Sequence, residues 1–136
     1  MIGIVVVAHG GLAREYLLAL EHVVGKHPGT MAVSIEADDV RAAKLDEIRD
    51  AIETVDTGHG VVVVTDIFGG TPSNLAMAAC GRVETTVVYG ANLPLLIKLA
   101  KARHRPLREA VSSAMDAGRK YINCSDTMPV LTAARA

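Results

Sequence analysis

Apolar residues follow two different patterns along this chain. Continuous β-branched runs, which are typical of strands buried on both faces, predict strands over 2–8, 31–35, 60–65 and 83–89. Apolar positions spaced by three or four residues predict helices over 12–24, through 45–55, from 72 onwards, from 92 towards 103, and over 107–120. Strands that alternate with helices favour right-handed βαβ units. The pattern therefore predicts an α/β fold, a three-layer, doubly wound arrangement of a mostly parallel sheet with helices on both faces.

Short polar residues and prolines mark the predicted helix starts. Asp38 or Asp39 is expected to cap the second helix, and Thr71 to cap the third, in which the next residue is a proline at the favoured first position. Asn92 is expected to begin the fourth helix. After the last helix, residues 121–124 are expected to form a short strand at the edge of the sheet.

The length of 136 residues is that of one domain, and no repeat or low-complexity linker divides the chain. We expect the domain to span residues 1–125 and a C-terminal tail to span 126–136. Half of the residues are hydrophobic but only 3% are aromatic, so the core must consist of Val, Ile, Leu and Ala. That composition suits helices packed on a parallel sheet.

The charge and the cysteines exclude several classes of function. A formal net charge of -1 provides no basic field for nucleic acid or for a membrane surface. Cys80 and Cys124 form neither a metal-ligand cluster nor a disulfide framework, so both are expected to stay reduced. The first apolar run lacks a basic start and is interrupted by His9 and two glycines, which argues against a signal peptide or a membrane span. We therefore expect a cytoplasmic protein.

Candidate chemistry gathers at the carboxyl ends of the predicted strands. His9 follows the first strand, Asp66 ends the third, and residues 90–92 follow the fourth. In open parallel sheets these ends lie at one edge, where ligands bind. A neutral imidazole is a nucleophile toward phosphorus, and a carboxylate bonded to its other nitrogen fixes the tautomer and stabilises the cation. His9 and Asp66 are therefore the candidate catalytic pair.

A glycine-rich turn follows Asp66 and precedes a predicted helix. Gly69, Gly70 and Thr71 offer backbone N–H groups and one hydroxyl at a helix N-terminus, which suits a phosphate. Alternatively, the same residues form an ordinary turn before a capped helix. The turn is no Walker A loop because no Lys follows it, and residues 9–13 form no dinucleotide fingerprint. No metal site is predicted, since the other histidines lack ligand spacing and are interpreted as structural or solvated: His22, His27, His59 and His104.

Three motifs in order carry a family resemblance: Val-Ala-His-Gly at 7–10, Asp-Ile-Phe-Gly-Gly-Thr-Pro at 66–72, and Gly-Ala-Asn-Leu-Pro at 90–94. With them the chain resembles, over nearly its whole length, the enzyme IIA components of the mannose (mannose-fructose-sorbose) class of the bacterial phosphoenolpyruvate-dependent sugar phosphotransferase system (PTS). By that resemblance, residues 1–125 would be a mannose-type IIA domain. His9 would accept a phosphoryl group from the phosphohistidine of the carrier protein HPr and pass it to a IIB component for sugar uptake.

The resemblance also implies roles for the other site residues and for the partners. Asp66 would orient His9, and Thr71 with the glycine turn would lie beside the phosphate. The protein would act as a phosphotransferase that requires no metal, nucleotide or other cofactor, because the donor is already a high-energy phosphoramidate. The family further implies a homodimer in which a C-terminal strand, assigned to 121–125, is exchanged between subunits and lies antiparallel at the sheet edge.

Three alternatives to this interpretation stay open. The same phosphorylation would control partner proteins, without sugar transport, in a regulatory binding module. A relay subunit of dihydroxyacetone kinases also carries an N-terminal active histidine, although its motif after the third strand differs. A small-ligand domain without phosphotransfer would use the glycine turn for a free anion. A response-regulator receiver is disfavoured, because it requires an acidic pair where this chain has Ala8 and His9.

Overall fold

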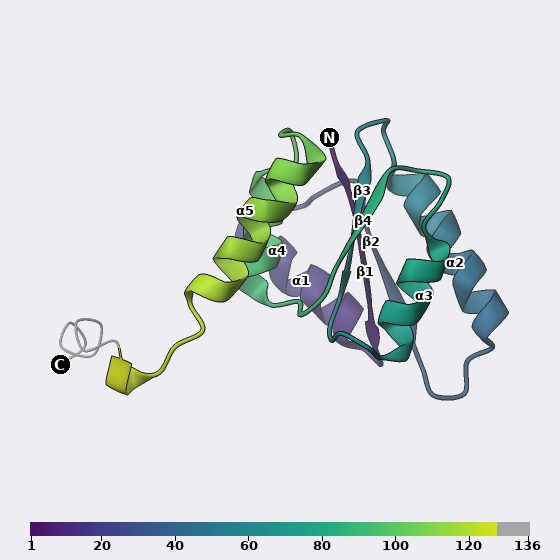
Figure 1. The fold of residues 1–136 in the computed structure, drawn as a ribbon, viewed down its shortest axis with the longest axis horizontal. Coiled ribbons are helices and arrows are strands. Elements are labelled where there is room, and N and C mark those ends of the chain that lie inside the picture. The colour runs from purple at the N-terminus through teal and green to yellow at the C-terminus, as the bar shows by residue number, and fades with distance from the viewer. Residues whose placement is uncertain (128–136) are drawn as a thin grey trace.

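A four-stranded parallel sheet forms the middle layer of the molecule, with strand order β2-β1-β3-β4 (Figure 1). The structure is a computed structural model and describes residues 1–127. The strands are β1 (Gly3–His9), β2 (Thr30–Ile35), β3 (Val61–Thr65) and β4 (Thr85–Val88). One face is covered by α1 (Leu12–Val24), α4 (Leu93–Lys101) and α5 (Leu107–Lys120), and the other by α2 (Arg41–Val55) and α3 (Thr71–Ala79). The predicted α/β fold with helices on both faces is confirmed.

The two central strands explain the continuous apolar runs in the sequence. Along β1, Ile4 and Val6 face the core beneath α1, α4 and α5, whereas Val5 and Val7 face the core beneath α2 and α3. β3 alternates in the same way, and its valines are fully buried. A strand turns successive side chains to opposite faces. Because both faces of these strands are covered, only the exposed end of β1 at His9 has a position that favours a polar residue facing solvent.

The parallel register brings the ends of the central strands together. Val7 of β1 pairs with Thr65 of β3, and His9 at the end of β1 pairs with Ile35 of β2. Asp66 follows β3 directly. His9 and Asp66 therefore lie side by side at the carboxyl edge of the sheet, as their positions at the ends of two predicted strands indicated.

Two of the predicted helix caps are wrong. α2 begins after Val40, which makes no side-chain capping bond, and Asp39 instead accepts a hydrogen bond from the backbone N–H of Glu36 at 2.6 Å. Thr71 is the first residue of α3, and Gly70 occupies the capping position before it. Short polar side chains bond to the backbone of a turn as readily as to the start of a helix. The sequence therefore indicated the right turns but not the partner of each side chain.

The edge strand predicted over 121–124 is absent. α5 ends at Lys120, and an irregular stretch leads to a 3-10 helix at Ser125–Thr127. Tyr121 and Ile122 are 60% and 74% exposed, and Figure 1 shows this segment leading away from the sheet. Because most of the surface of these two side chains stays exposed, little apolar burial drives the segment to pair with the sheet.

Three further expectations concern the chain end, the membrane and the thiols. The predicted tail 126–136 lies outside the described residues from 128 onwards. No helix within residues 1–127 is long and apolar enough to cross a membrane. Cys80 is half-buried and Cys124 is exposed, and both are thiols. Burial raises the pKa of the Cys80 thiol, so it stays protonated at neutral pH.

A buried arginine ties the end of α4 to the start of the sheet. Arg103 is 2% exposed, and burial lowers the pKa of its guanidinium. Its Nε donates to the Ile2 carbonyl at 2.7 Å, and its two Nη atoms donate to the carbonyls of Pro28 and Gly29 at 2.8 and 3.0 Å. The guanidinium fork therefore holds β1 and the turn before β2 in one frame.

Arg103→Met is expected to lower the free energy of unfolding by about 2–4 kcal/mol, because methionine fills the space but leaves three carbonyl oxygens without a charged donor. Urea unfolding followed by circular dichroism measures the change. Arg103→Lys keeps the charge without the fork and should recover only part of the loss. Arg108→Met at an exposed position of α5 is the control. A loss below about 0.5 kcal/mol for Arg103→Met, the range of ordinary surface substitutions, contradicts the assigned role.

Candidate active site

His9 is the point at which buried β1 meets solvent. The residues before it in β1 are fully buried, whereas the His9 side chain is 47% exposed. Asp66 is its neighbour from the end of β3, and that carboxylate side chain is only 8% exposed. The imidazole can therefore meet a partner from solution, while the carboxylate behind it is shielded.

Asp66 holds His9 through two hydrogen bonds to one oxygen. Its Oδ2 accepts from the His9 backbone N–H at 3.1 Å and lies 2.7 Å from the ring Nδ1. Its Oδ1 accepts from the Ile67 backbone N–H at 3.0 Å. Burial alone would raise the pKa of the carboxyl, but the bonds from the ring and from the two N–H groups outweigh it and hold that pKa below its ordinary value.

The tautomer of the His9 ring follows from the charge of Asp66. An ionised carboxylate only accepts hydrogen bonds, so Nδ1 must carry the proton that is shared with Oδ2. Nε2 is then the unprotonated nitrogen with the lone pair, and it is the ring nitrogen that does not face Asp66. His9 is thereby prepared to react at Nε2 as a neutral nucleophile.

Gly70 lets the loop after β3 run along the reactive side of the ring. A Cβ at this position would lie 3.0 Å from Cε1 and 3.4 Å from Nε2 of His9. The φ of Gly70 is -88°, which any residue adopts, so the reason for a glycine here is the space and not the backbone conformation. The backbone at Gly70 therefore lies beside the Cε1–Nε2 edge of the ring.

Ser73 holds the glycine turn in shape. Its hydroxyl accepts from the Gly69 N–H at 3.0 Å and donates to the Gly70 carbonyl at 2.9 Å, and the side chain is buried. Gly69, predicted to bind phosphate, therefore already uses its N–H within the loop. Within residues 1–127, the N–H groups of Gly70 and Thr71 and the Thr71 hydroxyl bond to no other group. These three donors are therefore available to bind an anion.

The loop after β4 plays a supporting role. The Ala91 N–H donates to the Thr65 carbonyl at 2.9 Å, and the Tyr16 hydroxyl donates to the Ala91 carbonyl at 3.2 Å. Asn92 caps α4 as predicted, accepting from the Leu95 N–H at 3.0 Å. The loop thus fixes the end of β3, just before Asp66, but none of its residues lines the pocket beside His9.

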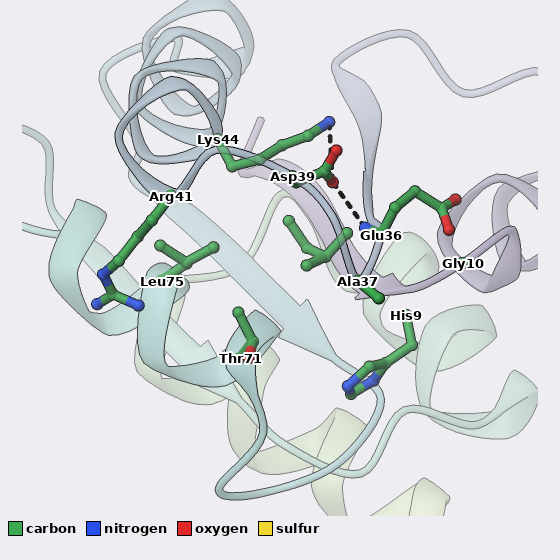
Figure 2. A pocket seen from close by; sticks show the side chains of 10 residues that line it. His9, Gly10, Glu36, Ala37, Asp39, Arg41, Lys44, Thr71 and Leu75 are labelled. Carbon is green, nitrogen blue, oxygen red and sulfur yellow. Dashed lines mark hydrogen bonds and ion pairs between the residues drawn. The ribbon is translucent and has the colours of Figure 1, made fainter.

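The pocket beside His9 opens toward the end of β2 and not toward β4. It has a volume of about 350 Å³ and lies between the loop after β2 and the start of α3 (Figure 2). The sequence reasoning missed the contribution of the β2–α2 loop, although β2 ends at the same edge of the sheet. The pocket is lined by His9, Gly10, Ile35, Glu36, Ala37, Asp39, Arg41, Lys44, Thr71 and Leu75.

Two ion pairs lie on the wall of this pocket that α2 provides. Lys44 Nζ lies 2.8 Å from Glu47 and 3.8 Å from Asp39. The hydrogen bond to Glu47 raises the pKa of the Lys44 ammonium, and neighbouring carboxylates add to the effect. No group of three His, Cys, Asp or Glu residues that could hold a metal ion is present in residues 1–127. The site offers an imidazole nucleophile beside hydrogen-bond donors.

Gly70→Ala is expected to impair chemistry at His9 without unfolding the protein. Because the added methyl group would lie 3.0 Å from Cε1, the ring must turn away from Asp66 or the loop must retreat, and the reactivity of Nε2 should fall about tenfold or more. The rate of modification of His9 by diethyl pyrocarbonate measures it. Gly11→Ala, where a Cβ meets nothing within 4 Å, is the matched control. Equal rates for the two variants contradict the prediction.

Comparison with known proteins places the chain in a family. The model of the EIIA-man family, described as "PTS system fructose IIA component", matches residues 3–115. The PTS system mannose-specific EIIAB component of Escherichia coli (strain K12) is 26% identical over 99% of this chain and 43% of its own length. The PTS system sorbose-specific EIIA component of Lacticaseibacillus casei is 29% identical over 82% of each chain.

A solved structure agrees with this placement. The mannose/sorbose specific IIA subunit of the phosphotransferase system from Enterococcus faecalis superposes with a TM-score of 0.81, at 25% identity, over 90% of this chain and 93% of that one. The chain spans less than half of the mannose-specific EIIAB relative and most of the single IIA components. Because the family model matches most of its residues, the chain belongs to the EIIA-man family, the mannose-class IIA components of the PTS.

Proposed function

We propose that this protein is a phosphocarrier of sugar uptake, in which His9 accepts a phosphoryl group from the phosphohistidine of HPr and passes it to a IIB component. The observation that carries the proposal is the 2.7 Å contact between Nδ1 and the ionised Asp66, which leaves Nε2 as the nucleophile. Membership of the EIIA-man family and the PTS names of the relatives support the same reading.

The transfer exchanges one nitrogen–phosphorus bond for another. Nε2 of His9 attacks the phosphorus, the bond to the donor imidazole breaks, and its electron pair returns to the donor ring. The His9 ring then carries a positive charge, which the Asp66 carboxylate faces at Nδ1. The free N–H groups of Gly70 and Thr71 are suited to bind the phosphoryl oxygens, because the N-terminus of α3 favours negative charge. In the transfer to IIB, a nucleophile of IIB attacks the phosphorus, the bond to Nε2 of His9 breaks, and its electron pair returns to the His9 ring.

An exposed apolar patch beside the site suits a protein partner. Ile67 and Phe68 follow Asp66 and are 53% and 79% exposed. The Phe68 ring packs edge-on against Tyr89, with 5.0 Å between ring centroids, so it is held in place although solvent reaches it. Aromatic side chains on a rigid support are typical of protein interfaces. HPr and IIB would dock over this patch in turn.

We further propose that residues 1–125 work as a homodimer in the cytoplasm. Tyr121 and Ile122 expose their apolar side chains beyond α5, which a second copy would cover. Light scattering coupled to size exclusion tests the dimer. A mass twice the chain mass of 14.3 kDa supports it, and a mass equal to one chain overturns it.

Transfer of labelled phosphate tests the proposed function. The protein is incubated with labelled phosphoenolpyruvate, enzyme I and HPr, and the label is then followed to a IIB component. Label that is stable in alkali and labile in acid, and that IIB removes, supports the carrier. Label that IIB components do not remove favours the regulatory module. No label, with HPr itself labelled as a control, overturns the proposal.

A further inference from the structure

The pocket beside His9 contains a cation to which the proposed reaction has so far assigned no role. We propose that Arg41 is a phosphoryl-binding residue of this site, which helps to hold an oxyanion of the phosphate class in the pocket beside His9. The inference rests on the proposed phosphocarrier function and deepens it. Arg41 lies on the side of the pocket that α2 provides, across from the glycine turn at Gly69 and Gly70.

Arg41 and His9 line one pocket although 32 positions separate them in the sequence. Arg41 is the first residue of α2, and Thr71 is the first residue of α3. Both side chains line the pocket together with His9, and Figure 2 shows Arg41 on the α2 wall with Leu75 and Thr71 on the α3 wall. A group on Nε2 would thus enter a pocket that has the Thr71 hydroxyl beside it and the Arg41 guanidinium at the end away from His9 (Figure 2).

The two cations of the pocket, Lys44 and Arg41, differ in whether a carboxylate neutralises their charge. Lys44 is engaged by Glu47 and Asp39, and the charge of Glu36 also acts on it. The Arg41 side chain forms no ion pair and no hydrogen bond within residues 1–127. Arg41 is therefore the basic group of the pocket whose charge is available to an incoming anion.

The acidic side chains of the pocket do not offset Arg41. Asp39 Oδ2 accepts from the Glu36 N–H at 2.6 Å and faces Lys44. In Figure 2 the Glu36 carboxylate extends toward Gly10, on the other side of the pocket from Arg41. The positive end of the pocket is thus the end shared by Arg41 and Thr71.

The chemistry of these groups selects the ligand. A guanidinium donates two parallel hydrogen bonds and matches the oxygens of a phosphate, which an ammonium does not. The Thr71 hydroxyl and the Gly70 N–H add uncharged donors that no group within residues 1–127 occupies. The oxyanion can be the phosphoryl group bound to His9 or a free phosphate, and both would use the same donors.

Phosphorylation kinetics test the proposal. Wild type, Arg41→Gln, Arg41→Lys and the control Arg108→Gln are compared for the limiting rate of His9 phosphorylation and for the concentration of phospho-HPr that gives half of it. Arg41→Gln should lower the limiting rate about tenfold, with little change in the phospho-HPr concentration that gives half of that rate. The limiting rate of Arg41→Lys should lie between those of wild type and Arg41→Gln. Equal limiting rates for Arg41→Gln and wild type overturn the proposal. A change in half-saturation alone also overturns it, because Arg41 would then contact HPr and not the phosphoryl group.

Titration with inorganic phosphate separates the two sources of the oxyanion. Amide shifts of Gly70 and Thr71 are followed by NMR in the unphosphorylated protein. Binding that Arg41→Gln weakens shows that the pocket also takes free phosphate. A slower limiting rate without phosphate binding assigns Arg41 to the covalently held group. If the wild type accepts no label at all, the proposed function fails. In that case, phosphate binding that depends on Arg41 still supports the proposed oxyanion site, and a lack of phosphate binding overturns the proposed site.

Discussion

His9→Ala is expected to abolish acceptance of labelled phosphate, lowering it by on the order of 10³-fold or more, because the substitution removes the nucleophile itself. Among the histidines of residues 1–127, His9 is the one paired with a carboxylate. His59, for comparison, contacts the chain N-terminus and Thr57 at the opposite end of the sheet. No other imidazole combines exposure with an ionised partner, so none is expected to replace it.

The His9→Ala result needs a control for folding and one for non-specific labelling. The His9 side chain is 47% exposed, and Asp66 keeps its bonds to two backbone N–H groups, so the free energy of unfolding should change by only about 1 kcal/mol. His22→Ala removes an exposed imidazole at the end of α1 and should leave labelling unchanged. Label of wild-type amount and acid lability on His9→Ala contradicts the assignment.

The meeting of His9 and Asp66 was predictable from sequence because it depends on topology alone. Two continuous apolar runs, each followed by a polar residue, indicate neighbouring buried strands whose ends share an edge. The β1–β3 pairing then places both residues at that edge whatever the details of packing. Strand order fixes such a contact more firmly than any local preference of the residues involved.

The loop details were not predictable, because they depend on which of several equivalent bonds forms. Thr71 and Ser73 are both good partners for a turn, and the structure uses Ser73 for the Gly69 N–H and leaves the Thr71 hydroxyl free. A signal for the pocket did exist, since β2 must also end at this edge. Following that rule to the loop after Ile35 would have found Arg41.

Asp66→Asn is expected to lower the rate of phosphorylation by on the order of 10²-fold or more. If the amide oxygen takes the place of Oδ2, the NH₂ group faces the Ile67 N–H, so two donors meet. If the amide is flipped, the NH₂ group faces two donors, the backbone N–H and the ring N–H of His9. Either orientation loses the negative charge that faces the phosphorylated ring. The transfer assay described above measures the rate. A rate within about threefold of wild type contradicts the role, because that difference is less than one neutral hydrogen bond contributes.

The dependence of the free energy of unfolding on pH in the acid range separates the effect of the Asp66 charge from that of its hydrogen-bond geometry. Its pKa is held below the ordinary value in the folded protein, so the carboxylate stabilises the fold at pH values above its unfolded pKa, and that contribution disappears as pH falls through the folded pKa. The difference in free energy of unfolding between wild type and Asp66→Asn should therefore shrink as pH falls below the range in which ordinary carboxylates titrate. Urea unfolding of both proteins over that range measures it. A difference that does not change with pH would show that Asp66 acts through its hydrogen-bond geometry alone, and the stabilisation of a charged His9 ring would then have no source in the fold.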